Sequence, residues 1–127
     1  MLTDRLLRQI LDNLTTAVIM LDAELRVNYI NPAAEILLAV SGQRVALQHF
    51  GELFNDSEAA IQPLQAAILS ANPFTKREAQ LNLTNGQSLM VDYSVTPIGN
   101  QNTSWLLMEL HPRDRLLRIT KEEAQLS

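Results

Sequence analysis

The chain has 127 residues, of which 46% are hydrophobic and 19% are charged, a balance typical of one folded domain rather than a disordered tail. The absence of cysteine excludes disulfides, thiolate metal sites and a cysteine nucleophile. A formal net charge of -4 disfavours nucleic acid as a partner, and no apolar run reaches the roughly 20 residues that span a membrane. We therefore expect a cytoplasmic protein without a secretory signal.

The first 14 residues carry an apolar stripe with the period of an α-helix. Its members recur at steps of three and four, with charged and polar residues between them: Leu2, Leu6, Leu7, Ile10, Leu11 and Leu14. An isolated helix of this length is only marginally stable in water, so some surface must cover the stripe. The domain's own sheet could do so, but we predict a second copy of the chain, which makes residues 1–14 a dimerisation helix.

Two strands are predicted next, over 15–21 and 25–29, because apolar and β-branched residues run or alternate on either side of a polar turn. Asn31-Pro32 then indicates a helix start, since Asn caps the first turn and Pro lacks only a donor that this turn does not use. We predict that this helix runs to about Val40 and that Ser41-Gly42 ends it.

Between residues 43 and 71 the pattern predicts short helices that are broken at Gly51 and Pro63. Strand character returns after residue 73, with alternation over 78–83. Asn85-Gly86 then predicts a two-residue hairpin turn, because this pair tolerates positive φ angles.

A further alternating strand is predicted over 89–96, a turn over 97–100, and a more continuously apolar strand over 105–110. The order of elements predicts an α+β domain over 15–112, with one antiparallel sheet and helices on one face. Residues 113–127 are charged, with apolar residues at coiled-coil-like spacing. We predict an exit helix there, with a signal-output stripe formed by Leu116, Ile119 and Leu126.

One motif resembles a known family. The run Tyr29-Ile30-Asn31-Pro32-Ala33-Ala34-Glu35 and the Asn-x-Ala-x-x-x-Leu spacing of Asn31, Ala33 and Leu37 resemble PAS sensory domains. The segments 10–18 and 111–115 are similar to the N-terminal sensory part of bacterial nitrogen-regulation sensor histidine kinases of the NtrB type. The resemblance covers about residues 1–112.

This resemblance implies a five-stranded antiparallel sheet, homodimerisation through the flanking helices, and a two-component phosphorelay that regulates transcription. It also implies partners: a histidine kinase core downstream in the parent protein, a PII-type signalling protein and a response regulator. The family's kinase chemistry needs a phosphorylatable His within a His-Glu-x-x-x-Pro-like segment and glycine-rich boxes for ATP. Neither occurs in this chain, whose glycines are scattered singly, so we expect no enzyme activity from it.

Candidate sites for chemistry are few. His49 and His111 lie far apart in the sequence without acidic residues at ligand spacing, so we expect no metal site. His49 could mimic an axial haem ligand, but a position in a loop or cap explains it more simply. A flavin adduct would need a cysteine, and we expect no cofactor. Asp92 we interpret as a solvated residue on the polar face of its strand.

A small-molecule pocket is the remaining alternative, since the sheet and helices of such a fold can enclose a cavity. Six apolar or amphipathic residues could form its walls: Val18, Met20, Tyr29, Ile36, Val91 and Met108. They could equally well form an ordinary core, because nothing polar is visibly placed to orient a ligand. We therefore predict a regulatory domain that dimerises and relays a signal to a kinase core, with ligand binding in the core as the alternative input.

Overall fold

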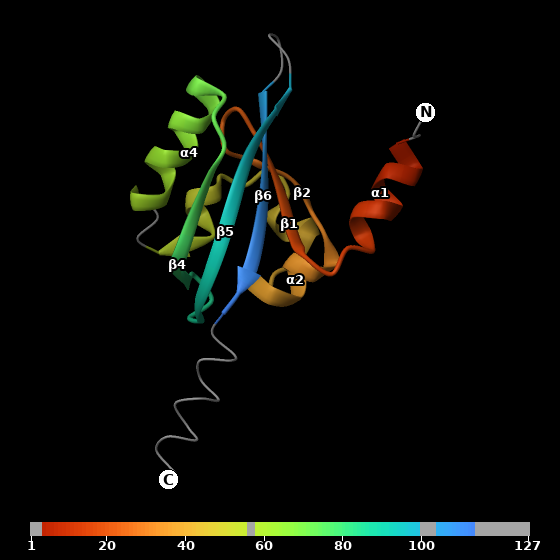
Figure 1. Cartoon of the computed structure of the whole chain (residues 1–127). Coiled ribbons are helices and arrows are strands. Elements are labelled where there is room, and N and C mark those ends of the chain that lie inside the picture. The colour runs from red at the N-terminus through yellow and green to blue at the C-terminus, as the bar shows by residue number, and fades with distance from the viewer. Residues whose placement is uncertain (1–3, 56–57, 100–103, 114–127) are drawn as a thin grey trace, which may run out of the picture.

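The computed structural model describes residues 4–55, 58–99 and 104–113 and contains one antiparallel sheet with most helices on one face (Figure 1). The elements are α1 (Asp4–Asp12), β1 (Ala17–Asp22), β2 (Val27–Ile30), α2 (Pro32–Leu38), α3 (Gly42–Val45), the 3-10 helix η1 (Phe50–Glu52), β3 (Phe54–Asn55), α4 (Glu58–Ser70), β4 (Phe74–Leu83), β5 (Ser88–Gly99) and β6 (Ser104–Pro112). The strands lie in the order β2-β1-β6-β5-β4-β3.

The α+β prediction is confirmed, and all five predicted strands form. The sheet has a sixth strand, however, because the two-residue β3 pairs with the end of β4 through Phe54 and Leu83. A strand of two residues has no alternation that a sequence pattern could reveal.

The two faces of the sheet follow from strand register. Ile19 and its partner Met108 are buried under the helices, on what we call the inner face. The neighbouring pair, Met20 and Leu107, points to the opposite outer face, because successive side chains alternate. The helices complete the core on the inner face with Leu38 of α2, Phe50 of η1 and Leu64 of α4.

The end of α2 differs from the prediction. The helix ends at Leu38, and Ala39 takes the left-handed conformation with a φ of 54°. Gly42 begins α3 instead of ending α2. A Cβ at this position would lie 3.1 Å from the Ile30 side chain, so the absence of a side chain permits the close approach of α3 to β2.

Neither predicted helix break occurs where the sequence placed it. Gly51 lies inside η1, and Pro63 lies inside α4, which continues to Ser70. A proline within a helix removes one backbone hydrogen bond. The burial of Leu64 and Ala67 against the core offsets this loss.

The β4–β5 hairpin forms at Asn85-Gly86, but its loop has three residues rather than two. The Leu83 amide donates to the Gln87 carbonyl (2.8 Å) and the Gly86 amide to the Leu83 carbonyl (3.0 Å). Within this loop only Gly86 has a positive φ, 96°. This is the pattern of a turn followed by a glycine bulge.

The predicted turn over 97–100 is also displaced, because β5 continues through Pro97 to Gly99, paired with β6. The pairing of β5 with β4 extends only to Val95, so Pro97 has a neighbouring strand on one side, where a missing donor is tolerated. The predicted exit-helix residues Leu116, Ile119 and Leu126, and Leu2 at the other end, lie outside the described residues.

Candidate functional site

The apolar stripe of α1 is largely uncovered within one chain. No residue of α1 is buried, and Leu11 is half-buried. The exposed fractions of the other described stripe members are 43% for Leu6, 45% for Leu7, 44% for Ile10 and 41% for Leu14. The chain's own sheet therefore covers only part of the stripe.

A groove of about 540 Å³ separates α1 from the outer face of the sheet. Its walls are mainly apolar and come from Leu7 and Leu11 of α1, Met20 of β1, Tyr29 of β2 and Trp105 of β6. Figure 1 shows α1 on the opposite side of the molecule from α4. α1 is thus the one described helix that faces the outer side of the sheet, and its apolar stripe and the groove form a continuous surface.

Polar contacts attach α1 to β2. The Arg8 guanidinium lies 5.6 Å from the centre of the Tyr29 ring, and the Tyr29 hydroxyl donates a hydrogen bond to Asp12 Oδ1 at 2.5 Å. Burial, together with this bond to Asp12, raises the pKa of Tyr29 well above its ordinary value, so the phenol keeps its proton at neutral pH. Arg8 and Asp12 do not stand out in the sequence, because both lie off the apolar stripe.

Asn31 joins the end of α1 to the rest of the fold. Its side chain is fully buried, and its Oδ1 accepts hydrogen bonds from the Ala34 and Val18 amides, both at 2.9 Å. Its Nδ2 donates to the carbonyls of Leu11 (3.2 Å) and Thr16 (2.8 Å). The predicted cap of α2 is confirmed, and the same amide also holds β1, the linker before it and the last turn of α1.

The six predicted pocket residues do not enclose one cavity. Met20 and Tyr29 are register partners whose side chains reach the groove beside α1, on the outer face, and Val18 alternates to the same side as Met20. Val91 and Met108 are buried in the core on the inner face, and Ile36 is 81% exposed on α2. The sheet itself separates these groups.

His49 caps a short helix, and His111 is paired within a strand. His49 Nδ1 accepts a hydrogen bond from the Gly51 amide at 3.0 Å and so caps η1. His111 lies on β6 opposite Asp92. Within residues 4–55, 58–99 and 104–113, no group of three or more His, Asp and Glu side chains is arranged to hold a metal ion.

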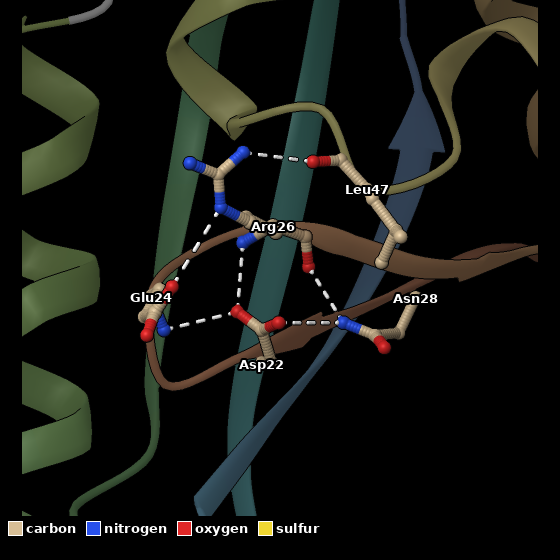
Figure 2. Close-up of polar contacts among 5 residues, drawn as sticks. All are labelled: Asp22, Glu24, Arg26, Asn28 and Leu47. Carbon is tan, nitrogen blue, oxygen red and sulfur yellow. Dashed lines mark hydrogen bonds and ion pairs between the residues drawn. The ribbon is translucent and has the colours of Figure 1, made fainter.

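A polar network fixes the turn between β1 and β2 (Figure 2). Asp22 accepts from the amides of Glu24 (2.9 Å) and Arg26 (3.0 Å) and from Asn28 Nδ2 (2.9 Å), while Arg26 donates to the Leu47 carbonyl (2.9 Å). Burial alone would raise the pKa of Asp22, but these hydrogen bonds outweigh it, and the pKa lies below its ordinary value. The network ties the hairpin to the loop after α3.

Asp92 is not simply a solvated residue, as the sequence suggested. It accepts hydrogen bonds from the Glu78 amide (2.9 Å) and from Arg113 (3.2 Å), and these contacts lower its pKa. Arg113 also lies 3.5 Å from the Glu78 carboxylate, and its amide donates to the Met90 carbonyl. The cluster fixes the position at which the chain leaves β6.

The family model described as PAS fold matches residues 5–113, and the chain therefore belongs to the PAS family. Within this family it is similar to PAS domains of nitrogen regulation. The crystal structure of the PAS domain of nitrogen regulation protein NR(II) from Vibrio parahaemolyticus is 33% identical, with a TM-score of 0.69, and the match covers 85% of this chain and 98% of that one.

Two curated relatives are also similar to this chain over most of its length. The sensory histidine kinase/phosphatase NtrB of Vibrio alginolyticus is 31% identical over 113 residues, and that of Klebsiella oxytoca is 28% identical over 117 residues. The matches cover 89% and 92% of this chain but 32% of each relative, so the chain spans about a third of their length. None of the described helices is long and apolar enough to cross a membrane.

Proposed function

We propose that the chain is the regulatory PAS domain of a nitrogen-regulation histidine kinase, where it forms a homodimer through α1 and relays a signal to a kinase core. The similarity to NtrB proteins supports the regulatory role. In this proposal catalysis belongs to the kinase core, and a PII-type protein and a response regulator act with the whole kinase.

The exposed stripe of α1 is the observation that carries the dimer proposal. Complete burial of a Leu or Ile side chain contributes roughly 1.5–3 kcal/mol. Leu6 and Ile10 each leave about two-fifths of their surface exposed. Covering that remainder on both copies of a two-fold dimer would contribute roughly 3–5 kcal/mol, before any other contact is counted.

The attachment of α1 supports the relay proposal. Its polar contacts to the sheet come from neighbouring residues, Tyr29 on β2 and Asn31 at its end, and Asn31 also binds β1 and α2. A shift of the sheet or of α2 would therefore move α1, and with it the contact between two copies. At the other end, Arg113 and Asp92 fix the exit from β6, so that the following segment would move with the sheet.

Sedimentation of the double variant Leu6→Glu with Ile10→Glu tests the dimer. The loss of roughly 3–5 kcal/mol corresponds to a rise of at least about a hundredfold in the dimer Kd, so the variant should sediment as a monomer at micromolar concentration. The matched control is Ile36→Glu with Leu69→Glu, since these residues are 81% and 88% exposed on α2 and α4. It should sediment like the wild type.

Two outcomes would contradict the proposal. If the wild-type chain is a monomer at micromolar concentration, the exposed stripe does not join two copies. If the α1 variant remains a dimer while keeping the far-ultraviolet circular dichroism of the wild type, the interface lies elsewhere.

A further inference from the structure

The turn between β4 and β5 contains the only Asn-Gly pair in the sequence, Asn85-Gly86. Residues 84–88 are all exposed, and Figure 1 shows this turn at the same end of the molecule as α2. After any asparagine, the backbone nitrogen of the next residue can attack the side-chain carbon Cγ of the amide. A side chain on that next residue normally shields the nitrogen, whereas glycine has none. The turn therefore combines exposure with the dipeptide in which this attack is least hindered.

The space around Gly86 is open. Apart from its two chain neighbours, a Cβ built on this residue would meet no atom within 4 Å. Its φ of 96° lies in the region that glycine enters readily and other residues rarely adopt. Water or hydroxide can therefore reach this residue, and such a base must remove the amide proton before the nitrogen can attack.

The fold polarises the Asn85 side chain. Its Oδ1 accepts a hydrogen bond from the Gln87 amide at 3.0 Å. When a nitrogen adds to Cγ, negative charge develops on this oxygen, and a backbone amide aimed at it stabilises that charge. The Nδ2 group, which would leave as ammonia, donates to the Leu38 carbonyl at the end of α2 (3.2 Å). Both polar atoms of the side-chain amide are thus held by main-chain groups.

One contact restrains the reaction while the turn is closed. The Gly86 amide donates to the Leu83 carbonyl at 3.0 Å, so its proton is engaged until that bond opens. A short exposed loop opens at a small fraction of the free energy that unfolds a whole domain. The attack therefore needs only a local opening of the turn.

We propose that Asn85 is a modification site at which the chain deamidates itself. The deprotonated Gly86 nitrogen bonds to Asn85 Cγ, the Cγ–Nδ2 bond breaks, and ammonia leaves with a proton taken from solvent, which closes a succinimide ring. Water then opens the ring at either of its two carbonyl groups and leaves aspartate or isoaspartate at position 85. In sum, an amide and water give a carboxylate and an ammonium ion, so no oxidant or cofactor takes part.

The modification would remove a contact between distant parts of the fold. A carboxylate cannot donate a hydrogen bond, so the bond from Asn85 to the Leu38 carbonyl would be replaced by two opposed oxygen atoms. Asn31 caps the start of α2 and holds the last turn of α1, whereas Asn85 holds the end of α2. Deamidation would therefore loosen α2 irreversibly. This consequence goes beyond the proposed dimer and relay and does not depend on them.

Ageing of the purified whole chain in mildly alkaline buffer at physiological temperature, followed over weeks by peptide mass spectrometry, tests the proposal. We expect the mass gain of an amide-to-carboxyl exchange in the peptide that contains Asn85. This peptide should separate into an aspartate and an isoaspartate form, and the second identifies the succinimide route, because direct hydrolysis of the side chain gives aspartate only. Asn13 and Asn82, each followed by leucine, are internal controls and should stay intact.

Two variants test the chemistry. Gly86→Ala places a side chain next to the attacking nitrogen and should slow the reaction roughly tenfold. Because alanine is strained at this φ, Asn85→Gln provides a second test that leaves the glycine in place. Its longer side chain would have to close a larger ring, so the mass gain at position 85 should disappear.

A third variant tests the structural consequence. Asn85→Asp reproduces one product of the reaction, and amide hydrogen exchange at the end of α2 should become about two- to tenfold faster than in the wild type. Thr84→Asp is the matched control, since it adds the same charge to an exposed neighbour whose backbone amide, not its side chain, binds the Leu53 carbonyl. It should leave the exchange of α2 unchanged.

Three results would overturn the proposal: a folded chain that keeps Asn85 intact over weeks, a mass gain at Asn85 without isoaspartate, or equal exchange of α2 in the wild type and Asn85→Asp. Since no residue of α1 takes part in the reaction, none of these results bears on the proposed dimer.

Discussion

Replacement of Asn31 by alanine should be among the most damaging single changes in this domain. The Asn31 side chain is fully buried and makes four hydrogen bonds. In the variant, the amides of Val18 and Ala34 would lose their acceptor, and both residues are buried. Each buried group left without a partner costs about 1–3 kcal/mol.

The carbonyls of Leu11 and Thr16 are only partly buried, so water can replace the Asn31 amide at these two positions. The expected loss therefore comes mainly from the two amides and amounts to roughly 3–5 kcal/mol. One of them, the Ala34 amide, is the group that Asn31 caps at the start of α2. A loss of this size is a large share of the roughly 5–15 kcal/mol that stabilises a typical domain.

Urea denaturation followed by circular dichroism measures this loss. Asn31→Asp is an informative companion, because its carboxylate keeps both acceptor roles but sets an oxygen against the Thr16 carbonyl in place of the amide donor. Its loss should be smaller, about 1–3 kcal/mol, with faster amide hydrogen exchange in α1. Asn13→Ala, which removes one exposed bond to the Gln9 carbonyl, is the matched control and should change stability little.

A loss below about 1 kcal/mol in Asn31→Ala, with an unchanged denaturant slope, would refute this reasoning. It would mean that water or backbone movement satisfies the Val18 and Ala34 amides, and that Asn31 does not hold the four segments together.

Two further predictions concern the polar contacts on either side of β2. The pKa of Asp22 is lower in the folded chain, so its contribution to stability is present above its unfolded pKa and is lost as pH falls below about 4. The urea midpoint should therefore fall less steeply with decreasing pH in Asp22→Asn than in the wild type. Parallel profiles of the two proteins would contradict this. Tyr29→Phe removes the hydrogen bond to Asp12 and should lower the free energy of unfolding by about 0.5–1.5 kcal/mol. Amide hydrogen exchange should become faster in α1 but not in β6. Unchanged protection of α1 would show that this bond does not hold the helix.

Features that depend on near neighbours in the chain could be predicted from the sequence. The start of α2 is one, because the cap joins Asn31 to an amide only three residues away. The hairpin at Asn85-Gly86 is another. Its predicted loop length was wrong, because Gly86 has a positive φ whereas Asn85 does not. Alternation and apolar runs together located five of the six strands.

Features that depend on distant segments could not be predicted in this way. Pro63 fails to break α4 because the packing of Leu64 against the core outweighs a local preference. The position of Tyr93 opposite Lys76 depends on the register of β4 and β5, which the sequence suggests only approximately.

The apolar stripe of α1 combines a feature set by the sequence with one set by the tertiary structure. Its period is a property of the amino-acid order alone, and it determined that one face of the helix needs a cover. Tertiary structure decided that the stripe stays about two-fifths exposed and that Tyr29 and Asn31 hold the helix from β2. The reason is that periodicity assigns a side chain to a face, whereas the surface opposite that face is formed by residues far away in the chain.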